Sequence, residues 1–270
     1  MNSFVWRLID TGSLNGSENM AIDEALLNSF DPKISKPILR IYGWNSPSLS
    51  LGRFQNSAEV LDLVRCRADA LSVVRRVSGG GAIYHADELT YSIVCSPEHI
   101  PAATSVKDSF RILTGFLMGF YRNLGLAASY AVDSGSDLSR FGTRTDFCFA
   151  GKESFDIMIN EKKIGGNAQR RRKSAIFQHG SIPIVNRAAV GLAYMKNCTP
   201  AFAECATSLR DNGITSDVSV LNVQLIDAFK MHMGVNMQVS QLTHEEQELV
   251  RHLTVDKFAT DRWNLRGDEA

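Results

Sequence analysis

The spacing of apolar side chains is most regular between residues 104 and 124. Apolar residues occur there at Val106, Phe110, Leu113, Leu117, Phe120 and Leu124. Intervals of three and four residues place such side chains on one face of a helix. Gly125 follows directly, and glycine is common just after the end of a helix. The pattern therefore predicts a long amphipathic helix over 104–124.

The remaining segments divide into alternating and helical patterns. Short alternating or apolar runs predict strands over 4–10, 37–44, 48–54, 71–77, 89–96, 127–132, 155–160 and 174–185. Helical spacing predicts helices over 18–30, 58–70, 187–196, 221–233 and 244–258. Residues 133–145 are rich in Ser, Gly and Asp and predict a mobile loop.

Strands outnumber clean strand–helix–strand units in this order of elements. That order favours an α+β fold over a doubly wound nucleotide-binding fold. We predict a single domain with a mixed, largely antiparallel β-sheet flanked by helices. Residues 1–235 are expected to form its catalytic part and residues 236–270 a small helical appendage.

Composition restricts the classes of function. The chain has 270 residues, of which 44% are hydrophobic, with 29 Lys and Arg against 29 Asp and Glu. Balanced charge gives no general electrostatic argument for nucleic acid or an anionic membrane. The basic run 170–173 is predicted to be a solvated loop, with a docking patch for an acidic partner as the alternative.

The cysteines and the N-terminal segment bear on the compartment. Five scattered cysteines without a CxxC pair indicate neither a disulfide framework nor a zinc site. No apolar run reaches about 18 residues, so no membrane span is expected. Residues 1–10 lack a basic region followed by a long apolar one, so no secretory signal is predicted. These features together predict a cytoplasmic globular protein.

A run of three glycines is the most informative local motif. The segment 75–85 reads Arg-Arg-Val-Ser-Gly-Gly-Gly-Ala-Ile-Tyr-His, between apolar runs. Glycines bare the backbone, so a ligand or another chain segment can approach closely. Their amides can hold anionic or carbonyl oxygen, and Arg75 and Arg76 add positive charge. The alternative is a hairpin with a bulge, and the motif by itself does not decide between them.

A second glycine motif, Lys163-Ile-Gly-Gly-Asn-Ala-Gln169, is predicted to form a turn directly after a strand. Its lysine could bring an ammonium to a bound carboxylate, phosphate or thioester oxygen. Taken alone, however, a lysine in such a motif is more often a surface lysine on a hairpin. Neither motif has the glycine spacing of a P-loop or of a dinucleotide-binding turn.

Three further side chains could carry chemistry. His85 and His179 lie beside the glycine-containing turns, where a structural, hydrogen-bonded histidine is the more common outcome and a functional one is the alternative. Cys148 lies between Phe147 and Phe149, where a thiol could simply be packed. A nearby ammonium would instead favour the thiolate and allow the cysteine to accept an acyl group.

Several motifs in the same order resemble one family. The chain is similar to the catalytic domain shared by lipoate-protein ligases, lipoyl/octanoyl transferases and, more distantly, biotin protein ligases. The resemblance covers nearly the whole chain, and its motifs occupy residues 6–10, 19–27, 39–45, 75–85, 88–92, 163–169, 178–181 and 263–264.

The resemblance implies attachment of an octanoyl or lipoyl group to a lysine of a lipoyl domain or of the glycine-cleavage H protein. Ligases of the family use ATP and Mg²⁺ and form an acyl-adenylate. Transferases take the octanoyl group from a thioester of acyl carrier protein or H protein and need no cofactor or metal. The resemblance places substrate or nucleotide contacts at Arg75, Arg76, Ser78, Gly79, Gly80, Gly81, Ala82, Ile83, Tyr84, His85, Gly165, Gly166, Asn167, Ala168, His179 and Gly180.

The choice between the two mechanisms depends on Cys148. In cysteine-dependent octanoyltransferases a Cys-Phe pair precedes the motif lysine by fifteen residues, as Cys148-Phe149 precedes Lys163 here. The Glu-Leu-Thr-Tyr-Ser segment at 88–92 and the absence of a large accessory domain also resemble those enzymes. The segments 78–82 and 166–169 resemble ligases equally well. We therefore expect a Cys148 acyl-enzyme assisted by Lys163, with an ATP-dependent ligase as the alternative and a catalytically silent binding protein as a third class.

Overall fold

The computed structural model describes residues 4–133, 146–148 and 153–268. Apart from Asp133, the loop predicted over 133–145 lies outside these residues. The main strands are β1 (Val5–Leu14), β2 (Ile38–Trp44), β6 (Glu88–Cys95), β10 (Gly166–Arg171), β11 (Ile176–Pro183) and β12 (Asn236–Val239). The shorter strands are β3 (Ser48–Leu51), β4 (Ser72–Arg75), β5 (Ile83–His85), β7 (Ala128–Tyr130), β8 (Ile157–Ile159) and β9 (Lys162–Lys163).

The helices lie between and after these strands. They are α1 (Gly16–Ser29), α2 (Ser57–Val60), α3 (Leu63–Ala68), α4 (Val106–Asn123), α5 (Ala188–Leu192), α6 (Val218–Met233) and α7 (His244–Leu253). Short 3₁₀ segments occupy Pro97–His99, Ala131–Asp133, Pro200–Cys205 and Arg210–Asn212. Two π-helical turns, Thr254–Phe258 and Arg262–Arg266, follow α7. No helix in the described part of the chain is both long and apolar enough to cross a membrane.

The strands form one large sheet and two small ones. The large sheet has the order β10-β11-β6-β2-β1-β12. Its β1 is parallel to β2 and β12, whereas β2, β6, β11 and β10 are antiparallel neighbours. The small sheets have the orders β4-β3-β5 and β7-β8-β9. The predicted α+β fold with a mixed, largely antiparallel sheet is confirmed.

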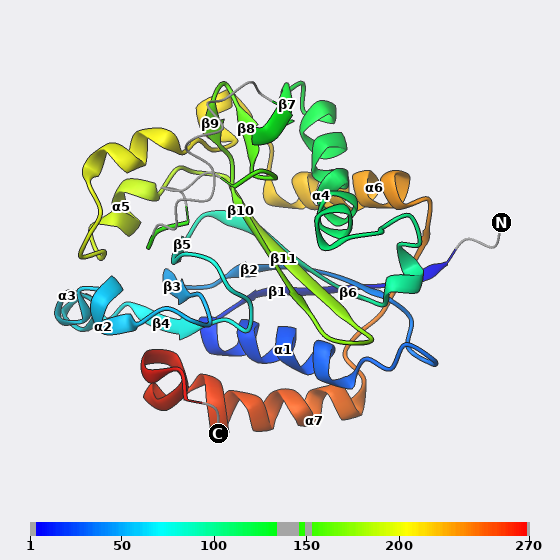
Figure 1. Ribbon diagram of the computed structural model, residues 1–270, viewed down its shortest axis with the longest axis horizontal. Helices are drawn as coiled ribbons and strands as arrows, with labels where there is room; N and C mark the ends of the chain where they lie inside the picture. The colour runs from blue at the N-terminus through cyan, green and yellow to red at the C-terminus, as the bar shows by residue number, and fades with distance from the viewer. Residues whose placement is uncertain (1–3, 134–145, 149–152, 269–270) are drawn as a thin grey trace.

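Helices cover both faces of the large sheet (Figure 1). Alternate residues of β6, Leu89 to Cys95, join Phe116 of α4 and Phe229 of α6 in one core. The opposite face packs against α1, with Ile22, Phe258 and Trp263 in a second core. Because side chains alternate along a strand, each long strand contributes to both faces.

The glycine run connects two strands that are not neighbours. Strands β4 and β5 pair with opposite edges of β3, in parallel and antiparallel senses respectively. The segment 76–82 therefore crosses from one side of β3 to the other, and the hairpin alternative for this motif is wrong. Gly80 has φ +95°, a conformation that favours glycine. Its carbonyl oxygen lies so near Gly52 that a Cβ added to Gly52 would be 2.0 Å from it.

Two helical predictions need correction. The helix expected over 58–70 is interrupted at Leu61, and Asp62 caps the second piece, α3, by accepting a hydrogen bond from the Arg65 amide. A carboxylate at this position satisfies an amide at the start of a helix and so favours a new helix there. The helix expected over 187–196 is the shorter α5, Ala188–Leu192.

The segment expected to form a turn after Lys163 is strand β10. Only Gly165 has a positive φ, +85°, and from Gly166 onward the chain pairs with β11. The basic run 170–173 begins on the last two residues of this strand, and residues 171–173 are exposed. The small and polar residues of this strand show no apolar alternation, so its sequence does not indicate a strand.

The stretch 236–270 is not only helical. Its first element, β12, extends the large sheet beside β1, and α7 packs on α1. Trp263 then donates a hydrogen bond to the Arg75 carbonyl of β4. The division of the chain at residue 235 stays a prediction, and these contacts connect the two parts closely.

Candidate active site

Polar side chains gather on the α1 face of three neighbouring strands. Register pairs Arg40 of β2 with Ser92 of β6, and Ser92 with His179 of β11. One pleat further along, Tyr42, Thr90 and Ser181 form a second row. Gly166 and Ala168 of β10 complete the rows opposite Ser181 and His179. The missing side chain at Gly166 leaves space above the sheet at that end.

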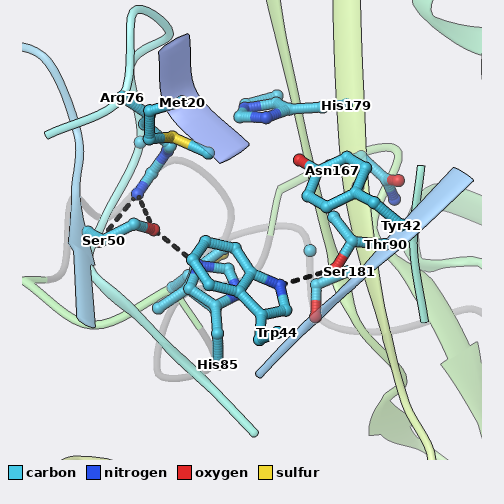
Figure 2. A pocket seen from close by; sticks show the side chains of 16 residues that line it. Met20, Tyr42, Trp44, Ser50, Arg76, His85, Thr90, Asn167, His179 and Ser181 are labelled. Carbon is cyan, nitrogen blue, oxygen red and sulfur yellow. Dashed lines mark hydrogen bonds between the residues drawn. The ribbon is translucent and has the colours of Figure 1, made fainter. Parts of the chain in front are cut away.

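A cavity of about 420 Å³, its open mouth included, lies over these rows (Figure 2). The lining residues are Met20, Tyr42, Trp44, Ser50, Arg76, Gly80, Ile83, His85, Thr90, Cys148, Gly166, Asn167, Ala168, His179, Gly180 and Ser181. They come from α1, from the large sheet, from the sheet β4-β3-β5, from the glycine segment and from Cys148.

The glycine segment holds Arg76 against the cavity. The Arg76 guanidinium donates hydrogen bonds to the carbonyls of Ser50, Gly79 and Gly81 and to the Ser50 hydroxyl. Burial lowers the pKa of Arg76 to about 10. Arg75 points elsewhere, because its guanidinium donates to five backbone carbonyls, those of Gly52, Arg53, Gln55, Trp263 and Leu265.

Cys148 reaches the cavity beside Ile83. The Cys148 amide donates to the Ala82 carbonyl at 3.0 Å, and the Ala82 amide donates to the Asp146 carbonyl at 2.8 Å. The half-buried sulfur lies against β10, where a Cβ on Gly166 would come within 2.7 Å of Sγ. Glycine at 166 is therefore required for the thiol to occupy this position.

Lys163 lies behind the cysteine and is 3% exposed. Its Nζ is 2.7 Å from the Cys148 carbonyl oxygen, 3.8 Å from Cys148 Sγ and 2.8 Å from Asp156 Oδ2. Burial alone would lower the pKa of Lys163, but its interactions with Cys148 and with the Asp156 carboxylate outweigh that effect. The pKa of Lys163 is therefore raised, and the side chain is an ammonium at neutral pH.

His85 is held between two hydrogen-bond partners. Its Nδ1 is 2.7 Å from Glu88 Oε1, and its Nε2 is 2.7 Å from Ser50 Oγ. Its ring stacks on Trp44 at 3.9 Å between centroids. Figure 2 shows Ser50 between Arg76 and His85. These two hydrogen bonds and the stacking fix the orientation of the His85 ring.

His179 occupies the other wall of the cavity. Its Nε2 is 2.6 Å from Ser78 Oγ, and its Nδ1 is 3.7 Å from Asp23 Oδ2. Burial lowers the pKa of His179, so the ring is neutral at pH 7. Burial alone would raise the pKa of Asp23, but Arg40 and the hydrogen bonds that the carboxylate accepts lower it.

Three comparisons with known proteins agree. The model of the lipoyl protein ligase A/B catalytic domain matches residues 15–230. The chain is 32% identical to octanoyltransferase LipM of Bacillus subtilis over 98% of this chain and all of that one. The chain belongs to the lipoyl protein ligase A/B catalytic domain family.

Solved structures of the family have the same fold. A lipoate-protein ligase A bound with ATP has a TM-score of 0.80 at 27% identity, over 97% of this chain and 98% of that one. A bipartite lipoate protein ligase from Thermoplasma acidophilum, described together with its E2 lipoyl domain, has a TM-score of 0.81 at 25% identity. That match covers 99% of this chain and 98% of the other.

Not every predicted contact of this ligase-family domain lies on the cavity. The predicted residues that line it are Arg76, Gly80, Ile83, His85, Cys148, Gly166, Asn167, Ala168, His179 and Gly180. Lys163 and Ser78 lie directly behind lining residues. Arg75, Gly79, Gly81, Ala82, Tyr84 and Gly165 are not among the lining residues, and Tyr84 stacks on Tyr194 instead. Their contact with a substrate stays a prediction.

Several residues at the cavity were missed as site residues. They are Met20, Tyr42, Trp44, Ser50, Thr90 and Ser181 at the surface, with Asp23, Arg40, Glu88 and Asp156 behind it. The polar residues Glu88, Thr90 and Ser92 occupy alternate positions of the otherwise apolar strand β6. That alternation could have identified Glu88 and Thr90 as site residues. Within residues 4–133, 146–148 and 153–268, no three His, Cys, Asp or Glu side chains are grouped to hold a metal ion.

Proposed function

We propose that this protein is an octanoyltransferase of protein lipoylation that holds the acyl group on Cys148. The observation that carries the proposal is the ammonium of Lys163 at 3.8 Å from Cys148 Sγ, at the wall of a largely apolar cavity. A cation at this distance attracts the charge of a thiolate, which is the nucleophilic form of cysteine. The 32% identity to octanoyltransferase LipM of Bacillus subtilis supports the same activity.

In the proposed first step, Cys148 Sγ attacks the carbonyl carbon of an octanoyl thioester. The new C–S bond forms as the carrier's C–S bond breaks, and the electron pair leaves with the carrier sulfur. Lys163 steadies the negative charge that develops on the carbonyl oxygen. Acyl carrier protein or the H protein supplies the thioester, and the tail of the octanoyl group lies between Met20, Ile83 and Trp44.

In the second step, the ε-amine of a lysine on a lipoyl domain or H protein attacks the Cys148 thioester. The octanoyl group passes to this amine and the cysteine is released. The known ligase described with its lipoyl domain supports this class of acceptor. No cofactor takes part in the proposed route, because the thioester supplies the free energy for both transfers.

The alternative is an ATP- and Mg²⁺-dependent ligase, supported by the similar ligase bound with ATP. The hydrogen-bond partners of Arg76 and Lys163, the two cations at the cavity, favour the transferase mechanism. Arg76 donates to carbonyls and Ser50, and Lys163 is bonded to Asp156 and to Cys148. A phosphate would have to displace these partners, whereas a thioester carbonyl needs only one nearby positive charge.

Intact mass measurement after incubation with octanoyl-acyl carrier protein tests the proposal. We expect one octanoyl adduct on the wild type, none on Cys148→Ser, and loading slowed roughly 100-fold in Lys163→Met. Cys198→Ser and Cys205→Ser are matched controls, because neither cysteine lines the cavity, and both should load normally. Octanoyl transfer at the normal rate by Cys148→Ser, or lipoate-dependent AMP formation without an adduct, would overturn the transferase mechanism.

A further inference from the structure

One buried carboxylate of this protein differs from the others. Five acidic residues in the described chain are buried, and four of them have an Arg or Lys partner: Asp23 with Arg40, Glu24 with Lys257, Asp156 with Lys163 and Glu246 with Arg7. The fifth, Glu88, has no Arg or Lys nitrogen within 4.0 Å among the described residues; its ionisable partner is His85. Buried charges are normally paired because their desolvation is costly.

The hydrogen bonds around Glu88 have fixed directions. A carboxylate only accepts, so the His85 Nδ1–H and the Thr90 hydroxyl donate to Oε1, each at 2.7 Å. The Ser181 hydroxyl donates to Oε2, also at 2.7 Å. With its proton directed at Glu88, Ser181 Oγ presents lone pairs to the cavity that it lines. A donor in the cavity can therefore bond to Ser181.

Ser181 is also close to the proposed nucleophile. It is the direct cross-strand partner of Gly166, and Gly166 is the residue whose Cβ would touch Cys148 Sγ. Cross-strand partners in antiparallel sheets lie about 5 Å apart between Cα atoms. Ser181 and Cys148 thus both line the cavity and both lie next to Gly166.

This inference rests on the proposed function, which leaves one proton without a destination. A lysine side chain has an ordinary pKa of about 10.4, so the acceptor arrives as an ammonium and cannot attack until it loses a proton. We propose that Ser181 and Glu88 receive the acceptor lysine's ammonium and relay its proton away. The ammonium thereby also supplies the cation that Glu88 lacks.

The proposed step balances as follows. One ammonium proton passes to Ser181 Oγ while the Ser181 hydroxyl proton passes to Glu88 Oε2. The freed amine forms the C–N bond with the acyl carbon, the C–S bond breaks, and the electron pair returns to Cys148 Sγ. A second proton leaves the nitrogen for that sulfur, and the third stays on the amide. Glu88 later releases its proton to water.

Single-turnover kinetics separates this relay from a structural role. Wild type, Glu88→Gln and Ser181→Ala are loaded with octanoyl from the carrier thioester and then mixed at pH 7 with a recombinant lipoyl domain or with hydroxylamine. Hydroxylamine is already unprotonated at this pH, so it needs no base. Both variants should load normally and react normally with hydroxylamine, but transfer to the lipoyl domain should slow roughly 100-fold. Asp87→Asn is the matched control, because this neighbouring carboxylate is exposed and pairs with Arg187.

The outcomes distinguish the two proposals. If either variant slows hydroxylamine and lipoyl-domain transfer equally, the pair is structural and the relay is wrong. Normal transfer by both variants also overturns it. Should Glu88→Gln fail to fold, Ser181→Ala gives the same decision, since only a neutral hydroxyl is removed. A wild type that forms no adduct on Cys148 overturns the proposed function and the relay together.

Discussion

At the scale of single residues, Gly166 determines whether the thiol and the cavity can coexist. Its φ is not positive, so the requirement is steric and comes from the sulfur of Cys148. Glycine is thus required at the two adjacent positions for two different physical reasons. Gly165 has φ +85° and lies against the Ser181 carbonyl, whereas Gly166 makes space for a side chain.

Gly166→Ala tests this steric account. The new methyl would lie 2.7 Å from Sγ and must displace the thiol, while the backbone can keep its strand conformation. We expect octanoyl loading of Cys148 to fall roughly 10- to 100-fold, the effect typical of misplaced reacting groups. Intact mass over time measures loading, and circular dichroism checks the fold.

Gly119→Ala provides the control for Gly166→Ala. A methyl at 119 meets its nearest neighbour at 3.9 Å, inside α4 and away from the cavity. Loading should stay at the wild-type rate, and the helix should gain up to about 1 kcal/mol. Equal loading by the two variants would contradict the steric role of Gly166.

At the scale of elements, the π-helical turn Arg262–Arg266 forms hydrogen bonds with β4, the strand that leads into the glycine segment. Asn264 Oδ1 accepts from the Arg75 amide at 3.0 Å, and Asn264 Nδ2 donates to the Phe258 carbonyl at 2.7 Å. Trp263 fills the core against α1. The end of the chain therefore supports the segment that carries Arg76, although it contributes no residue to the cavity.

Asn264→Ala should destabilise the protein. The substitution leaves a buried amide and a buried carbonyl without their partner, which costs about 2 kcal/mol for groups of this kind. Urea denaturation measures the change in the free energy of unfolding. Asn28→Ala, at an exposed position of α1, should change it little. An unchanged midpoint for Asn264→Ala would show that the turn is not a support.

Elements also differ in how far the sequence predicts them. The long helix α4 and the strand β6 follow regular apolar patterns and were predicted to within two residues. Strand β10 was missed because its residues Gly-Asn-Ala-Gln-Arg-Arg hold no large apolar side chain. Its pairing is decided by the backbone of β11 and by contacts far away in the sequence. Local strand propensity carries no information about such pairing.

At the scale of the whole molecule, buried and partly buried ion pairs join distant segments. Arg7 of β1 bonds to Glu246 of α7 at 2.8 Å, and Arg40 of β2 bonds to Asp23 of α1 at 2.8 Å. Burial alone would raise the pKa of Glu246, but Arg7 and the Thr243 amide lower it overall. The folded protein therefore binds this proton less readily than the unfolded chain does.

The lowered pKa of Glu246 sets the sign of a pH effect. A carboxylate with a depressed folded pKa stabilises the fold above its unfolded value, and this contribution is lost as the pH falls through the folded pKa. Glu246→Gln should cost about 2 kcal/mol at pH 7 and make stability less dependent on pH below about 4.5. Thermal melts between pH 3 and 7 measure both effects.

Glu245→Gln is the matched control for this substitution, since Glu245 is the exposed neighbour in the same helical turn. Its melts should follow the wild type across the whole pH range. If Glu246→Gln loses the same stability at pH 3 as at pH 7, the ion pair is not the origin of the pH dependence.

The sequence by itself determined the class of fold, the family and the identity of the cysteine, lysine and glycine motifs. These features are local, because a motif keeps its residues at a fixed spacing and a helix repeats its apolar face. Tertiary structure decided which motifs meet. It placed Cys148 against Gly166, Lys163 behind the sulfur, and Glu88 behind Ser181. The physical reason is strand register: pairing of β10, β11, β6 and β2 aligns residues from three distant parts of the chain on one face, and no single segment contains that information.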